Sequence, residues 1–348
     1  MGATIRVTQP GLLTTVQDLG RVGRLGMALS RGGALDRNAL SLANALVGNS
    51  LDAAGLEITG HGPALRFEQS SIIAWAGAGF DADLFVDGTL LTRLKSHRPI
   101  LIPAKSVVRW KSPMRGFRAW IAIAGGIEAP KVLQSRSSHL AAQVGLGRLE
   151  KNMELPLGEH SGQLTQLMTQ HLLKDTRLIE IANGDCDRRC LIPRWSIPEQ
   201  LPSDSQVLTL HAYKGRHFGL LSHEQQRELW NSVFHVSSKS NRQGLRLEGP
   251  AMVINGVASL PSEPVRFGTV QLPPEGIPYV LLAEHQTTGG YPRVLEVCSS
   301  MVRELAQAGP GVRVRFAPIT LDESQQRLRD NDLKLGALLT AIDAKLRS

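Results

Sequence analysis

The length, composition and charge of this chain limit what it can be. Its 348 residues exceed what one hydrophobic core usually supports, so we expect two domains. The 34 glycines and 19 prolines indicate many turns and more strand than helix. The formal net charge is +8, but no run of Lys and Arg interleaved with aromatic residues marks a nucleic-acid groove. Small anions or an acidic partner explain this charge better, with a plain solvated surface as the alternative.

Cysteine usage and hydrophobicity bear on metal binding and on location. Cys186 and Cys190 are four residues apart with no second pair to complete a zinc site, and Cys298 is the only other cysteine. Neither a disulfide framework nor a metal centre is expected. Residues 1–9 lack the layout of a signal peptide, and no eighteen apolar residues run together. We therefore expect a cytoplasmic protein that does not bind a membrane.

The first half is predicted to consist mainly of short strands. Apolar runs separated by turn residues predict strands at residues 5–7, 56–58, 64–67, 72–75, 84–86, 107–110 and 120–123. Many short strands at this spacing are typical of a barrel or a sandwich. Because strands and helices do not alternate, a Rossmann sheet is not expected.

A capped helix is predicted within this half, and a linker with a helical piece is predicted near residues 161–175. Leu40, Ala43 and Val47 recur at helical spacing, Asp36 suits the N-cap, and the Gly-Asn pair at 48–49 suits the stop. As a cap, Asp36 would be structural. Arg37 is harder to explain structurally if it faces the glycine-rich loop before it. The chain holds no G-x-x-x-x-G-K-[ST] sequence, so it encodes no Walker-type nucleotide site.

The second half repeats the strand-rich pattern and ends in a helix. Strands are predicted at residues 207–210, 269–272, 279–283, 294–297 and 312–316, and a polar stretch at residues 237–250 is predicted to open into another strand. Ser222 and Gln225 form a capping-box pattern that starts a helix through Trp230, and residues 302–306 form another. Residues 320–348 predict one amphipathic helix packed on its own domain or on a partner. The predicted domains are 1–175, 176–325 and a tail at 326–348.

The polar stretch at residues 286–292, QTTGGYP, interrupts two predicted core strands. Adjacent Gly289 and Gly290 would allow positive φ and direct successive N–H groups toward one point, with Gln286, Thr287 and Thr288 beside them. Such a hollow can hold a carboxylate, a phosphoryl group or an oxyanion. The alternative is a bulged hairpin whose threonines bond only their own backbone.

Seven ordered segments carry a family resemblance. They are residues 10–21 (PGLLTTVQDLGR), 33–36 (GALD), 43–49 (ANALVGN), 56–59 (LEIT), 124–127 (AGGI), 240–247 (SNRQGLRL) and 286–292 (QTTGGYP). Together they resemble the allophanate hydrolase subunit 2 family over about residues 4–325. That family includes KipA-type proteins, the C subunit of the bacterial ATP-dependent 5-oxoprolinase and the carboxyltransferase half of urea carboxylase.

The resemblance implies a fold, partners and three candidate functions. The expected fold is mainly β, with two cyclophilin-like β-barrel domains. The implied partners are a KipI-like B subunit of 5-oxoprolinase and a LamB/YcsF-like A subunit, and the complex would bind ATP and open 5-oxoproline to glutamate. Under an alternative, biotin-dependent carboxyl transfer to urea or a related amide, carboxybiotin would arrive on another polypeptide, because this chain has no Met-Lys-Met acceptor. A third reading is a KipA-type regulatory protein without activity. The isolated chain is expected to be inactive.

Site residues follow as hypotheses for the lactam reaction. The N–H groups of Gly289 and Gly290, with Thr287 and Thr288, would bind an oxyanion or phosphoryl group, and Arg242 would hold a carboxylate. The remaining hypotheses concern positioning: orienting the ring amide (Asn241, Gln286), walling the pocket or packing in the core (Tyr291), and binding substrate (Asp36, Arg37).

Overall fold

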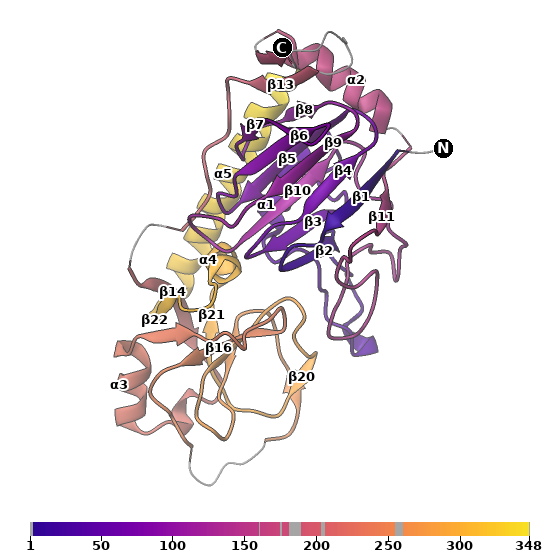
Figure 1. Ribbon diagram of the computed structural model, residues 1–348. Helices are drawn as coiled ribbons and strands as arrows, with labels where there is room; N and C mark the ends of the chain where they lie inside the picture. The colour runs from indigo at the N-terminus through magenta and orange to yellow at the C-terminus, as the bar shows by residue number, and fades with distance from the viewer. Residues whose placement is uncertain are drawn as a thin grey trace.

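The computed structural model describes residues 3–159, 161–174, 176–180, 189–202, 206–254 and 260–347. Over these residues the protein is mostly β, as expected from the sequence. Figure 1 shows a larger N-terminal half above a smaller C-terminal barrel, with a long helix running beside both. Within the described ranges, no helix has the length and apolar character needed to cross a membrane.

The N-terminal half consists of two sheets packed face to face. The six-stranded sheet has the order β11 (Glu154–Pro156), β1 (Thr4–Gln9), β4 (Ala64–Phe67), β9 (Ser106–Trp110), β6 (Ala82–Val86) and β7 (Thr89–Leu94). The seven-stranded sheet has the order β12 (Thr176–Glu180), β13 (Arg189–Pro193), β8 (Ile100–Ile102), β5 (Ser71–Gly77), β10 (Arg118–Ile123), β3 (Gly55–Thr59) and β2 (Leu13–Gln17). The core between them includes Trp75 and Trp110, whose rings meet edge to face at 5.7 Å.

The seven-stranded sheet is covered on both faces, which explains its continuous apolar strands. Along β5, Ile73 and Trp75 point into the core between the sheets, whereas Ile72 and Ala74 belong to a second apolar cluster. That cluster includes α1 (Arg37–Leu46), which packs on β5 and β10. A strand buried on both faces favours apolar residues at successive positions.

The C-terminal half is a closed barrel. Its strand order is β14 (Leu208–Lys214), β21 (Arg293–Val297), β18 (Thr269–Gln271), β19 (Tyr279–Leu281), β16 (Gly244–Glu248), β15 (Phe234–Val236) and β22 (Arg313–Pro318). The pair β14 and β22 is parallel and the other pairs are antiparallel. A separate pairing joins β17 (Glu263–Pro264) to β20 (Thr288–Gly289).

The predicted helix signals are confirmed. The Asp36 carboxylate accepts the N–H of Ala39 and caps α1, and Gly48 follows the helix with a φ of 75°. Ser222 and Gln225 form the capping box of α3 (His223–Asn231). The other short helices are α2 (Ser161–Leu172), α4 (Val302–Gln307), η1 (Leu25–Met27), η2 (Phe218–Leu220) and η3 (Ser299–Met301).

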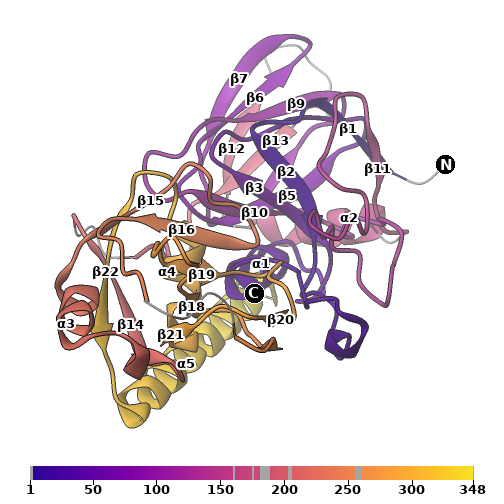
Figure 2. The same ribbon diagram turned by 90° about the horizontal axis from the view of Figure 1, so that it is seen from below.

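The predicted tail is one helix, α5 (Leu321–Arg347), and it joins the two halves. It runs from the barrel along the N-terminal half toward α2 (Figures 1 and 2). Its apolar stripe packs against a single cluster that contains residues of α1 and of the barrel, and Ile342 is 2% exposed there. The stripe is therefore buried within this chain, in agreement with the prediction that it packs on its own domain or on a partner.

The domain boundary predicted at residue 175 stays a prediction. Strand pairing shows to which half the residues just after it belong. β12 and β13 lie after residue 175, yet β13 pairs with β8 in the seven-stranded sheet. By strand pairing, residues 176–180 and 189–193 therefore belong to the N-terminal half. Residues 194–202, for which no strand is assigned, follow β13.

Candidate functional site

The loop at residues 286–292 does not form the predicted nest of N–H groups. Neither Gly289 nor Gly290 has a positive φ, so this part of the prediction is wrong. Thr288 and Gly289 instead extend as β20 along Glu263 and Pro264. An extended backbone points successive N–H groups to opposite sides, so it cannot direct them to one point.

The side chains and carbonyls of this loop are bonded locally. The Gln286 amide donates to Oε1 of Gln271 at 2.9 Å, and the Thr287 carbonyl accepts the N–H of Val265 at 3.1 Å. Gln286 and Thr288 are exposed, while Thr287 is half-buried. The catalytic assignment of Gln286, Thr287, Thr288, Gly289 and Gly290 stays a prediction, without the support of a preformed N–H nest.

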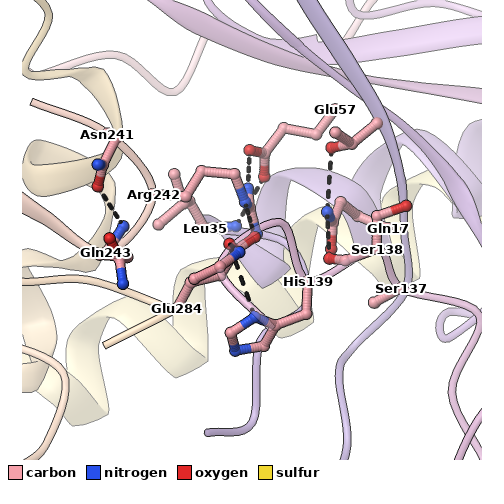
Figure 3. Close-up of polar contacts among 12 residues, drawn as sticks. Gln17, Leu35, Glu57, Ser137, Ser138, His139, Asn241, Arg242, Gln243 and Glu284 are labelled. Atoms are coloured by element: carbon pink, nitrogen blue, oxygen red, sulfur yellow. Dashed lines mark hydrogen bonds and ion pairs between the residues drawn. The ribbon is translucent and has the colours of Figure 1, made fainter. Parts of the chain in front are cut away.

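Arg242 lies at the junction of the two halves, where Figure 3 shows it between two carboxylates. Its Nε donates to Glu284 at 2.6 Å, its Nη1 donates to Glu57, and its Nη2 donates to the Gly33 carbonyl at 2.6 Å. The side chain is 2% exposed. Burial opposes the charged form, but Glu57 and Glu284 outweigh it and raise the pKa of Arg242. A guanidinium bonded to three protein acceptors has little bonding capacity left for a substrate carboxylate, so this geometry gives no support to the assignment of Arg242 as a substrate-binding residue, which stays a prediction.

The two carboxylates around Arg242 have further donors from the N-terminal half. The other oxygen of Glu57 accepts the Leu35 N–H at 2.9 Å and the Trp120 indole N–H at 3.0 Å. The other oxygen of Glu284 accepts the Ala141 N–H at 3.1 Å. Sequence reasoning missed both glutamates, although Glu57 gave a signal, because a charge inside a wholly buried strand must be paired.

A serine, a histidine and a glutamate line up beside this cluster. His139 Nε2 lies 2.9 Å from Ser30 Oγ, and His139 Nδ1 lies 3.7 Å from the Glu284 carboxylate. Nδ1 also accepts the Ala142 N–H at 3.2 Å, so the neutral ring carries its proton on Nε2 and donates to Ser30. Burial lowers the pKa of His139, which favours that neutral ring, although Glu284 opposes the shift. A nucleophilic serine donates its proton to the histidine, so in this tautomer Ser30 is not arranged as a nucleophile.

Asn241 and Tyr291 lie on the surface. The Asn241 side-chain oxygen accepts the Gln243 N–H at 2.8 Å, and both residues are exposed. Tyr291 is 42% exposed, so the interpretation that it packs in the core is wrong. The structure does not bring these two residues to the cavity described next.

A cavity of about 400 Å³ lies where the N-terminal half, the barrel and α5 meet. The predicted residues Asp36 and Arg37 line it, together with Arg266 and Arg303, which sequence reasoning missed. Apolar side chains, among them Leu35 and Phe267, complete the wall. This volume and this mixture of apolar surface with a few charged groups are typical of small-molecule sites.

Two of the charged groups that line the cavity, Asp36 and Arg37, are desolvated by burial. The Asp36 oxygen that does not cap α1 is 4.0 Å from Arg303 Nε, and burial raises the pKa of Asp36. Burial, with a smaller contribution from Arg31, lowers the pKa of Arg37 to about 10. Arg37 therefore stays protonated at neutral pH. Asp36 is a helix cap and a cavity residue at once, so the two readings of its role are compatible.

Two of the three cysteines lie in the part of the chain that the structure describes. Cys190 and Cys298 are buried free thiols, and Cys186 lies outside the described residues. Burial raises the pKa of Cys190 to about 12, which keeps it protonated. Across the part of the chain that the structure describes, no three His, Cys, Asp or Glu residues are grouped to hold a metal ion.

Comparison with known proteins gives consistent results. The family described as "Carboxyltransferase domain, subdomain A and B" matches residues 27–318. The C subunit of 5-oxoprolinase from Escherichia coli is 32% identical over 94% of both chains. The urea amidolyase of Lachancea kluyveri is 28% identical over 98% of this chain, which spans only 18% of that protein.

Solved structures show the same fold. A crystal structure of TTHA0988 matches 91% of this chain and 55% of its own, with 30% identity and a TM-score of 0.71. The urea carboxylase of Kluyveromyces lactis matches 97% of this chain and 29% of its own with a TM-score of 0.79, and at 22% identity it shows the fold alone.

Proposed function

We propose that this chain, which belongs to the carboxyltransferase domain family, is one subunit of an ATP-dependent complex that opens 5-oxo-L-proline to L-glutamate. The observation that carries the proposal is the 32% identity to a 5-oxoprolinase C subunit over 94% of both chains. A match over 94% of both chains includes residues of both halves. A shared barrel alone would support only a shared fold.

The chemistry explains why such a reaction needs several subunits. A lactam carbonyl is stabilised by resonance, and phosphorylation of the amide oxygen makes it an electrophile that water can attack. The chain has no Walker sequence, and the loop at residues 286–292 forms no N–H nest for phosphate. In the proposed complex, the partners therefore supply the groups that bind ATP. Those partners are a KipI-like B subunit and a LamB/YcsF-like A subunit, in the cytoplasm.

The cavity between the halves supports the substrate class. Three arginines and two aspartates line it, so it offers cations for a carboxylate and acceptors for an N–H group. Apolar walls suit the methylene groups of a small ring.

A second candidate is carboxyl transfer from biotin to urea or a related amide. The resemblance to urea amidolyase over 98% of this chain favours it. Carboxybiotin would then come from another polypeptide, because this chain has no Met-Lys-Met acceptor.

Reconstitution of the chain with both partners tests the proposal. We expect glutamate release that requires ATP, 5-oxoproline and all three subunits, and no turnover by the chain alone. ATP-independent carboxylation of urea from carboxybiotin would favour the second candidate. Tight complex formation without turnover of either substrate would favour a KipA-type regulatory role and contradict the proposal.

A further inference from the structure

The third wall of the cavity comes from a part of the chain outside the matched family domain. The match ends at residue 318, and α5 begins at Leu321. Leu328, Asn331 and Asp332 of this helix line the cavity. The helix is held in place by its apolar stripe, which packs on the core shared by both halves. The tail helix thus brings a carboxylate to a cavity whose other charged groups lie in the family domain.

The charges in the cavity differ in how they are paired. Arg266 lies 3.0 Å from Glu296, and Arg303 lies 4.0 Å from Asp36. The side chains of Arg37 and Asp332 make no hydrogen bond or ion pair with any other residue in the described ranges. The Arg37 guanidinium and the Asp332 carboxylate can therefore each form hydrogen bonds with a ligand in the cavity. In addition, Arg303 Nε is buried without a hydrogen-bond partner among the described residues.

This pairing pattern restricts the ligand. A phosphate dianion would meet two aspartates as well as the arginines, and an uncharged ligand would leave Arg37 desolvated without a partner. A small monoanion that also carries an N–H donor satisfies both free groups. The guanidinium can bind its carboxylate through two parallel N–H bonds, and the aspartate can accept its N–H.

We propose that this cavity binds a small carboxylic acid with an N–H donor, that Arg37 holds its carboxylate, and that Asp332 of α5 selects for the N–H group. The specific ligand class, a lactam acid such as 5-oxoproline, rests on the proposed function. The tail helix is then a determinant of specificity that the family domain alone lacks. Asp332 is exposed at the rim of the cavity, so a ligand can reach it from solvent.

Calorimetric binding of three probes tests this inference on the full chain, alone and with its partners. The probes are 5-oxoproline, cyclopentanecarboxylate, which lacks the N–H, and pyrrolidin-2-one, which lacks the carboxylate. We expect 5-oxoproline to bind about tenfold or more tightly than either analogue, because each analogue lacks one of the two charge-assisted hydrogen bonds. Absence of 5-oxoproline binding up to about 10 mM in both settings would overturn the inference.

Two variants separate the roles. Arg37→Gln is expected to weaken both carboxylates by about tenfold or more and to leave pyrrolidin-2-one unchanged. Asp332→Ala is expected to weaken 5-oxoproline about tenfold without weakening cyclopentanecarboxylate, so the preference between the two is lost. The controls are Arg329→Gln and Asp330→Ala, which change exposed residues of α5 that do not line the cavity.

The selectivity ratio distinguishes ligand contact from folding. A variant that only disturbs the fold would weaken all three probes together, and that outcome would contradict the proposed contacts. If the three probes bind with the expected affinity ratios but the complex releases no glutamate, the proposed function is contradicted and the proposed binding site is supported. If the complex releases glutamate but both variants keep the wild-type selectivity among the probes, the proposed function is supported and the proposed binding site is contradicted.

Discussion

Arg242 illustrates how a buried charge can hold a junction together. Two carboxylates from different halves flank its guanidinium, and each carboxylate has further donors of its own. Taking three charges out of water is costly, and their mutual attraction offsets that cost only where nearly every polar atom is bonded. The group is therefore much more sensitive to loss of one member than its net contribution to stability suggests.

We expect Arg242→Met to lower the free energy of unfolding by about 3–5 kcal/mol, because it leaves Glu57 and Glu284 buried without a cation. Urea denaturation followed by circular dichroism measures this change. Arg246→Met is the control, since Arg246 pairs at 3.4 Å with Glu275, a half-exposed carboxylate, and should cost less than about 1 kcal/mol. Equal stability of the two variants would contradict a structural role for Arg242.

Roles that depend on neighbouring residues in the sequence were easier to predict than contacts between distant residues. The helix-cap role of Asp36 depends on the three residues that follow it, and the sequence predicts it correctly. The fate of Arg242 depends on Glu57, which is 185 residues away along the chain. Local sequence patterns do not show which distant residues meet in the fold. The sequence alone therefore could not distinguish an arginine that binds a substrate carboxylate from one that binds a carboxylate of the protein.

At the scale of elements, hydrophobic patterns predicted most of the strands. Together with capping residues, they also predicted the helices that begin after Asp36 and Ser222. Strands such as β4 and β9 are recognisable because turn residues bound short apolar runs. The loop around β20 was harder to predict, because two adjacent glycines permit positive φ without requiring it. Packing decides the backbone there. An added Cβ at Gly289 would lie 2.4 Å from Gln271 Nε2, so close packing against a buried side chain is the reason for this glycine.

Gly289→Ala tests this account of the loop. The added methyl group must displace the buried Gln271 amide and break its bond to Gln286, so we expect a loss of about 1–2 kcal/mol in the free energy of unfolding. Hydrogen exchange should also become faster at the Val265 amide, which donates to Thr287. Gly26→Ala is the control, because open space surrounds Gly26. Indistinguishable stability of the two variants would show that the loop adapts at no cost.

At the scale of the whole molecule, the two halves share one apolar cluster and are also joined by hydrogen bonds. Gln307, at the end of α4, accepts the N–H groups of Phe117 and Arg118 at 2.7 and 3.0 Å and donates to the Arg118 carbonyl at 2.8 Å. Arg118 in turn donates to the Ala306 carbonyl at 2.7 Å. Burial of apolar surface across the junction couples the halves, so we infer that they unfold as one unit.

Gln307→Ala should weaken that coupling. The substitution leaves two buried N–H groups and one carbonyl without their partner, and we expect a loss of about 3 kcal/mol in the free energy of unfolding. Tryptophan fluorescence reports mainly on the N-terminal half, through the buried Trp75, Trp110 and Trp120, while circular dichroism reports on the whole chain. The two transitions should coincide in the wild type and separate in the variant, because the halves then unfold less cooperatively. Gln326→Ala, on the exposed face of α5, should change neither quantity. Separate transitions in the wild type would mean that the cavity lies between two independently folding bodies, and a rigid site at their junction would then be excluded.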